Sequence, residues 1–140
     1  MRSIVQWSDY IHSLDEIRHA EKISLLAQEL GKRQNCFIQI NLDNYQSNEN
    51  RSGIRPVELS RFANELSQFS GITIVGVMGV GPLSSDPRPA FAQLQEASQE
   101  LQKIVPGADF ISGGMSGDFR IAMDYGATHV RIGSSILGSR

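Results

Sequence analysis

The sequence predicts an α/β fold in which parallel strands alternate with helices. Three observations lead to this prediction: apolar strand-like runs alternate with segments of helical periodicity, the connections are short, and most of the runs are uniformly apolar, as in strands buried on both faces. The expected order is β-α-β-α-β-α-β-α-β with right-handed crossovers. About five such units cannot close a (β/α)₈ barrel, which needs roughly 200 residues or more. An open parallel sheet, complete in itself, is the alternative architecture.

The first two units occupy the N-terminal half. A short strand is expected at 10–12. Ser13 with Glu16 three residues later predicts the start of a helix that ends near Gly31. The next expected strand covers 36–42. The apolar residues that recur at helical spacing in the first helix are Leu14, Ile17, Ala20, Ile23, Ala27 and Leu30.

The next two units follow the same order. Pro56 suits the first turn of a second helix, and a strand is expected at 72–80. A third helix is expected from about Pro89 to Ile104, because Pro106 follows and cannot continue it. The residues expected to face inward on the second helix are Leu59, Phe62, Ala63 and Leu66.

The C-terminal stretch 110–140 contains two strand-like pieces that run directly into small residues. The pieces at 110–111 and 129–132 are followed by Gly/Ser-rich stretches at 112–117 and 133–135, and a helix is expected at 118–125. Such loops leave backbone N–H groups free at a helix start, where a phosphate is favoured. Two in succession match the place where many (β/α) barrels hold a phosphate. The residues alone leave open whether these are ordinary turns.

Two stretches resemble a known family. Gly-Met-Ser-Gly-Asp at 114–118 and Arg-Ile-Gly-Ser-Ser-Ile-Leu-Gly-Ser-Arg at 131–140 resemble the C-terminal signatures of the YggS/PROSC family of pyridoxal 5′-phosphate (PLP) homeostasis proteins. Ile-His-Ser-Leu-Asp at 11–15 resembles a further family motif, and Arg51 stands where the family usually has lysine. The resemblance implies that 1–140 is one partial domain, the C-terminal part of a PLP-binding barrel of the alanine racemase type.

The resemblance also implies which residues contact PLP. An arginine beside the pyridine nitrogen disfavours protonation of that nitrogen, because two neighbouring cations repel each other. The residues alone favour a different interpretation, in which Arg131 is a solvent-facing charge or ion pair at a strand end and Met78 is an ordinary core residue. The expected cofactor-binding residues are Met115 and Ser116 in the first phosphate loop, Gly133 and Ser134 in the second, Arg131 at the pyridine nitrogen, and Asn41 and Met78 at the ring face.

The family anchors the PLP aldehyde on a strand lysine, whereas the lysines here are Lys22, Lys32 and Lys103, and none falls in an expected strand. The Schiff-base lysine is therefore absent, and we expect neither covalent PLP binding nor a catalytic residue in this chain. The resemblance also predicts that the chain is N-terminally truncated. Such a chain is expected to self-associate, whereas the parent is expected to be a monomer. No metal site is expected at His12, His19 or His129.

Composition narrows the class of protein. An apolar fraction of 40%, a net charge of −2 and a pI near 5.9 are typical of a soluble globular protein and argue against nucleic-acid or membrane binding. The single Cys36, expected to be a buried structural thiol, fits a reducing cytoplasm, and no apolar run is long enough to span a bilayer. We therefore expect a cytoplasmic protein.

Three functions remain open. The leading hypothesis is a non-catalytic PLP carrier in intracellular PLP and amino- or keto-acid homeostasis. The alternatives are a PLP-dependent racemase-like enzyme and a barrel that binds another phosphorylated ligand.

Overall fold

The computed structural model describes residues 10–42, 53–79, 88–113 and 119–128. Four strands in these ranges form one sheet in chain order, and every neighbouring pair is parallel, as predicted. The strands are β1 (Tyr10–Leu14), β2 (Gln34–Gln39), β3 (Ile72–Gly79) and β4 (Phe110–Gly113). The expected fifth strand, at 129–132, lies outside the described residues.

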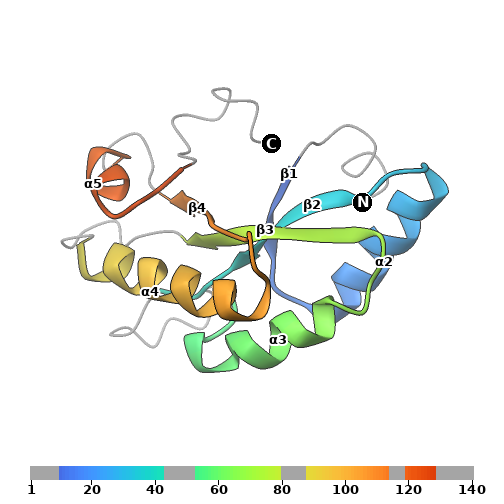
Figure 1. Ribbon diagram of the computed structural model, residues 1–140, viewed down its shortest axis with the longest axis horizontal. Coiled ribbons are helices and arrows are strands. Elements are labelled where there is room, and N and C mark those ends of the chain that lie inside the picture. The colour runs from blue at the N-terminus through green and yellow to red at the C-terminus, as the bar shows by residue number, and fades with distance from the viewer. Residues whose placement is uncertain (1–9, 43–52, 80–87, 114–118, 129–140) are drawn as a thin grey trace.

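Helices connect the strands. They are α2 (Ile17–Glu29), a 3₁₀ turn η1 (Pro56–Glu58) that leads into α3 (Leu59–Leu66), α4 (Arg88–Ile104) and α5 (Phe119–Asp124). The three long helices α2, α3 and α4 lie along one side of the sheet (Figure 1). A doubly wound sheet carries helices on both faces, so strands in chain order with helices on one side are the wall of a (β/α) barrel. The predicted partial barrel is confirmed over these residues.

The main hydrophobic core fills the space between this sheet and its helices. Alternate residues of β2 and its extension enter it, namely Cys36, Ile38 and Ile40, because successive side chains of a strand point to opposite faces. All four residues predicted to face inward on α3 are buried. The sheet therefore presents its other face, with Phe37 and Gln39 of β2, toward the barrel interior.

One extra residue shifts the phase of β3. Cys36 pairs with Ile74 and the next residue, Phe37, pairs with Gly76, so Val75 is a one-residue bulge. Before the bulge Ile74 packs into the core with the helices, and after it Val77 does. Met78 is consequently turned to the interior face of the barrel.

The start of the first helix differs from the prediction. Ser13 lies in β1, and α2 begins at Ile17 after an extended Glu16 that makes no side-chain capping bond. The chain stays extended because Leu14 pairs with Ile38 and is buried in the core, 2% exposed. The predicted stop is confirmed, since Gly31 follows the helix with φ +71°.

The end of β4 differs as well. Ser112 and Gly113, predicted to open a loop, continue the strand and pair with Met78 and Gly79. After α5 the chain returns to β4, where Thr128 donates its backbone N–H to the carbonyl oxygen of Ile111 at 2.8 Å and accepts the Ile111 N–H on its hydroxyl at 2.9 Å.

Cys36 is fully buried, and burial raises the pKa of its thiol from 9.0 to about 12. The thiol is therefore structural at neutral pH, as predicted. Among the helices that the structure describes, none has the length and apolarity to cross a membrane.

Candidate functional site

The carboxyl ends of parallel strands meet at the same end of a sheet, and the candidate site residues that the structure describes lie at this end. Gln39, Met78 and Ser112 stand side by side in register on β2, β3 and β4. The side chain of Met78 is 2% exposed and Ser112 is fully buried. The interior face therefore ends in a row of an amide, a thioether and a hydroxyl.

An aromatic layer lies one step below this row. Phe37, Gly76 and Phe110 are in register, and the two rings stack with centroids 6.3 Å apart and an interplanar angle of 29°. A Cβ at Gly76 would lie 1.9 Å from the carbonyl oxygen of Phe110, so no side chain fits there. The layer gives the carboxyl-end row an apolar floor.

Asn41 is the second residue after β2 and is half-buried. Its backbone N–H donates to the carbonyl oxygen of Ile54 at 2.8 Å, and the N–H of Ile54 donates to the carbonyl oxygen of Gln39 at 2.9 Å. The segment that begins at Gly53 therefore returns to the tip of β2 and forms a parallel bridge with it. The structure places Asn41 under this return, at the same end of the sheet as Met78.

Sequence reasoning missed a contact that joins two units at this end. Asp15, directly after β1, accepts the backbone N–H of Gly53 on Oδ2 at 2.8 Å. The 11–15 motif that ends in Asp15 was the available signal, although its partner is 38 residues away along the chain.

The remaining predicted cofactor contacts, Met115, Ser116, Arg131, Gly133 and Ser134, lie outside the described residues. Their roles in binding PLP stay predictions, as do those of Asn41 and Met78. The elements described on either side of the first of these loops are the strand β4 and the helix α5.

The three lysines lie away from the strands. Lys22 is exposed on α2, Lys103 is exposed on α4, and Lys32 is half-buried in the turn after α2. No lysine therefore stands at the carboxyl end where a strand lysine would reach a ligand.

Asp15, Glu16 and His19 bring potential metal-ligating atoms within 4.8 Å of one another at the start of α2. Glu16 already accepts a hydrogen bond from Arg18 at 3.0 Å, and Asp15 accepts one from Gly53. Both carboxylates thus have protein partners, and we assign no metal to this group.

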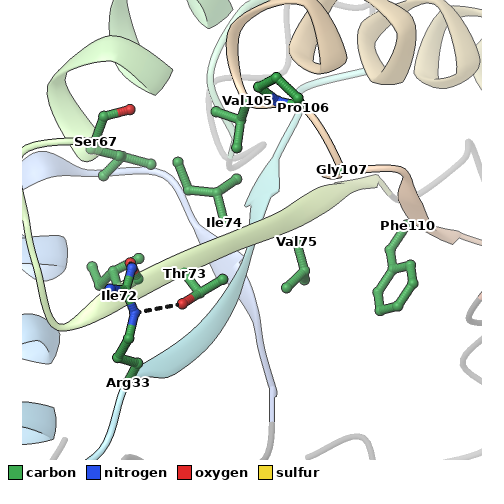
Figure 2. A pocket seen from close by; sticks show the side chains of 11 residues that line it. Arg33, Ser67, Ile72, Thr73, Ile74, Val75, Val105, Pro106, Gly107 and Phe110 are labelled. Carbon is green, nitrogen blue, oxygen red and sulfur yellow. Dashed lines mark hydrogen bonds between the residues drawn. The ribbon is translucent and has the colours of Figure 1, made fainter.

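A pocket of about 380 Å³ lies at the opposite, amino end of the sheet (Figure 2). Arg33 stands at its edge and donates from Nε to the hydroxyl of Thr73 at 2.9 Å and from Nη2 to the carbonyl oxygen of Ile72 at 3.0 Å. The apolar wall includes Val75 and Phe110. Asn41 and Met78, the two predicted cofactor contacts within the described residues, are not among the residues that line it.

The family model of the alanine racemase N-terminal domain matches residues 1–140, and the chain belongs to this family. Its curated relatives include the pyridoxal phosphate homeostasis proteins of Mycobacterium tuberculosis, 31% identical over 99% of this chain, and of Corynebacterium glutamicum, 34% identical over 99%. The chain spans 56% and 64% of those two proteins. These relatives support its place in the YggS/PROSC group.

Solved structures of related proteins share the fold of this chain. PipY of Synechococcus elongatus, a structure with PLP bound, matches with a TM-score of 0.81 and 31% identity over 94% of this chain and 62% of PipY. An alanine racemase from Clostridium difficile matches with a TM-score of 0.73 over 95% of this chain and 38% of the racemase. At 16% identity, the racemase shows a shared fold alone.

Proposed function

We propose that this chain contributes a non-covalent binding surface for pyridoxal 5′-phosphate at the carboxyl end of its sheet, as part of a PLP carrier in the cytoplasm. The observation that carries the proposal is the similarity in sequence and fold to PipY with PLP bound. The buried, reduced Cys36 is compatible with a cytoplasmic setting.

The residues present suit one mode of holding PLP. Met78 offers a buried thioether and Asn41 an amide, neutral groups that can contact an aromatic ring and its polar substituents. We assign Ser116, Gly133 and Ser134 to the phosphate and Arg131 to the pyridine nitrogen. All three lysines lie off the strands, so the fit is to a ligand held without a covalent bond.

PLP supplies an electrophilic aldehyde and an electron-accepting pyridine ring when it is bound. An arginine at the pyridine nitrogen keeps this nitrogen unprotonated, which weakens the ring as an electron acceptor. We therefore expect storage or delivery of PLP rather than a reaction on it, in line with the lack of a lysine at this end.

Arg131→Ala tests the assignment, with Arg33→Ala as the matched control at the amino end. We expect Arg131→Ala to weaken PLP binding about 10-fold or more, since a charge-assisted contact is worth roughly 1.5–3 kcal/mol, and Ser116→Ala to weaken it similarly. Arg33→Ala is expected to leave the affinity unchanged. Equilibrium dialysis of the purified chain against PLP, pyridoxal and ribose 5-phosphate measures all three variants.

Two results would contradict the proposal. Tighter binding of ribose 5-phosphate than of PLP would point to a different phosphorylated ligand. Equal loss of PLP in Arg33→Ala and Arg131→Ala would mean that the carboxyl end is not the site. Borohydride reduction is expected to trap no stoichiometric PLP adduct, because no lysine lies at this end.

A further inference from the structure

The bond between Asp15 and Gly53 connects the ends of two neighbouring β/α units. Asp15 stands where β1 ends, and Gly53 stands where the chain returns to the tip of β2. The carboxylate Oδ2 accepts the Gly53 N–H at 2.8 Å in a half-buried position. A bond to a charged acceptor is roughly twice as strong as one between neutral groups, so this contact can fix a backbone position.

Gly53 is tightly constrained at this point. Its φ of +112° is strained for any residue with a side chain, and an added Cβ would lie 2.7 Å from the backbone nitrogen of Asn41 and 2.8 Å from the carbonyl carbon of Ile40. The backbone of Gly53 therefore rests directly on the tip of β2. Asp15 holds it from the side of β1.

Asn41 is coupled to this arrangement. Its own N–H is bonded to the carbonyl oxygen of Ile54, the residue after Gly53. A shift of Gly53 therefore moves the bond that orients the Asn41 backbone. Glu16, the next carboxylate along the chain, accepts a hydrogen bond from Arg18 instead.

We propose that Asp15 is a positioning residue: it fixes Gly53, and through Ile54 also Asn41, against the tip of β2, and thereby sets the affinity of the carboxyl-end site for PLP. The effect on PLP rests on the function proposed above. The positioning of Gly53 does not, so it can be measured without ligand.

The experiment compares Asp15→Ala and Asp15→Asn with Glu16→Ala, a neighbouring variant that removes the same charge. Amide hydrogen exchange by NMR reports the opening of individual bonds, and equilibrium dialysis reports PLP affinity. In Asp15→Ala we expect the Gly53 amide to exchange on the order of tenfold faster and PLP to bind about 3- to 10-fold more weakly. Asp15→Asn, whose amide oxygen can still accept, is expected to recover both values to within about threefold. Glu16→Ala should change neither value, and the Gly71 amide, bonded elsewhere, should be unaffected in all three.

Each result bears on one part of the proposal. An unchanged exchange rate at Gly53 in Asp15→Ala would refute the positioning. Faster exchange with unchanged PLP affinity would refute the link to the cofactor. A wild-type chain that retains no PLP would overturn the proposed function, whereas the exchange rates would still decide whether Asp15 positions Gly53. If Asp15→Ala does not melt cooperatively, Asp15→Ser, whose side chain is too short to reach Gly53, takes its place with the same expected changes.

Discussion

The two ends of the sheet are held together in different ways. At the amino end, helix side chains bond to the loop that enters β3: the hydroxyl of Ser24 accepts the Gly71 N–H at 2.9 Å, and Gln28 donates to the hydroxyl of Ser70. At the carboxyl end, Asp15 bonds to a returning loop, and the strands end in Met78 and Ser112 on the interior face. The amino end thus connects helices to strands, whereas the carboxyl end connects one loop to another.

This difference separates stability from binding. Contacts between helices and strands support the core, so their loss should lower the free energy of unfolding without altering a ligand site far away. The loss of contacts between loops at the carboxyl end should alter both the free energy of unfolding and the ligand site. This division agrees with the general pattern of (β/α) barrels, in which binding residues lie at the carboxyl ends of the strands and the amino ends serve stability.

The largest expected effect comes from a glycine at each end. An added Cβ at Gly71 would lie 2.3 Å from the carbonyl oxygen of Ser24, so Gly71→Ala should destabilise the fold by about 3 kcal/mol without changing PLP affinity per folded molecule. Gly53→Ala should destabilise by about 2 kcal/mol and also weaken PLP binding, because it displaces the return beside Asn41. Urea unfolding and PLP dialysis measure the two quantities.

Gly31→Ala is the control for both variants. Like Gly53, Gly31 has a positive φ, but nothing lies within 4 Å of an added Cβ, so a cost of about 1 kcal/mol is expected from strain alone. If Gly71→Ala weakened PLP binding as much as Gly53→Ala, the separation of the two ends would not hold.

A smaller effect is expected from Ser24→Ala. The substitution leaves the buried Gly71 N–H without its hydroxyl acceptor, which should lower the free energy of unfolding by about 2 kcal/mol. Ser60→Ala, an exposed serine on α3, should change it by less than about 0.5 kcal/mol. Denaturant titration measures the free energy of unfolding of both variants. Equal midpoints would show that the Ser24 hydrogen bond does not contribute to stability.

The smallest effect concerns Cys36 and pH. The pKa of its thiol is about 12 in the folded protein against 9.0 ordinarily, so the unfolded chain loses this proton first as the pH rises. The contribution of the protonated thiol to the free energy of unfolding is fully present below pH 9 and is lost as the pH rises from 9 to 12. At pH 10 the loss is about 1 kcal/mol. Unfolding measured at pH 8 and pH 10 should show this loss relative to Cys36→Ala. Parallel pH profiles for the two proteins would rule the effect out.

Much of the fold could be predicted because the signals are local. The apolar faces of α3 and α4 and the stop at Gly31 depend on residues within a few turns of one another. Ser13 misled because a capping pattern cannot reveal that Leu14 will pair with Ile38 on another strand. The Asp15–Gly53 bond was missed for the same reason, since its two partners meet only after the barrel wall has formed. Of the predicted site, Asn41 and Met78 lie at the carboxyl end of the sheet, and the contact of every predicted residue with PLP stays a prediction.

The bulge at Val75 determines how a one-residue deletion in β3 would affect the residues that follow it. Side chains of a strand alternate between its two faces, and the extra residue interrupts this alternation between Ile74 and Gly76. Deleting Val75 would remove the bulge and leave a regular ladder in which Gly76, Val77 and Met78 still pair with Phe37, Ile38 and Gln39. Val77 would then still pack with the helices, and Met78 would still face the barrel interior. If β3 instead kept Val75 in a regular ladder without the bulge, Val77 would turn to the interior face and Met78 would turn toward the helices. A one-residue gap at Val75 in an alignment therefore preserves the faces of the residues that follow it, whereas a relative that has a residue there needs the bulge to do so.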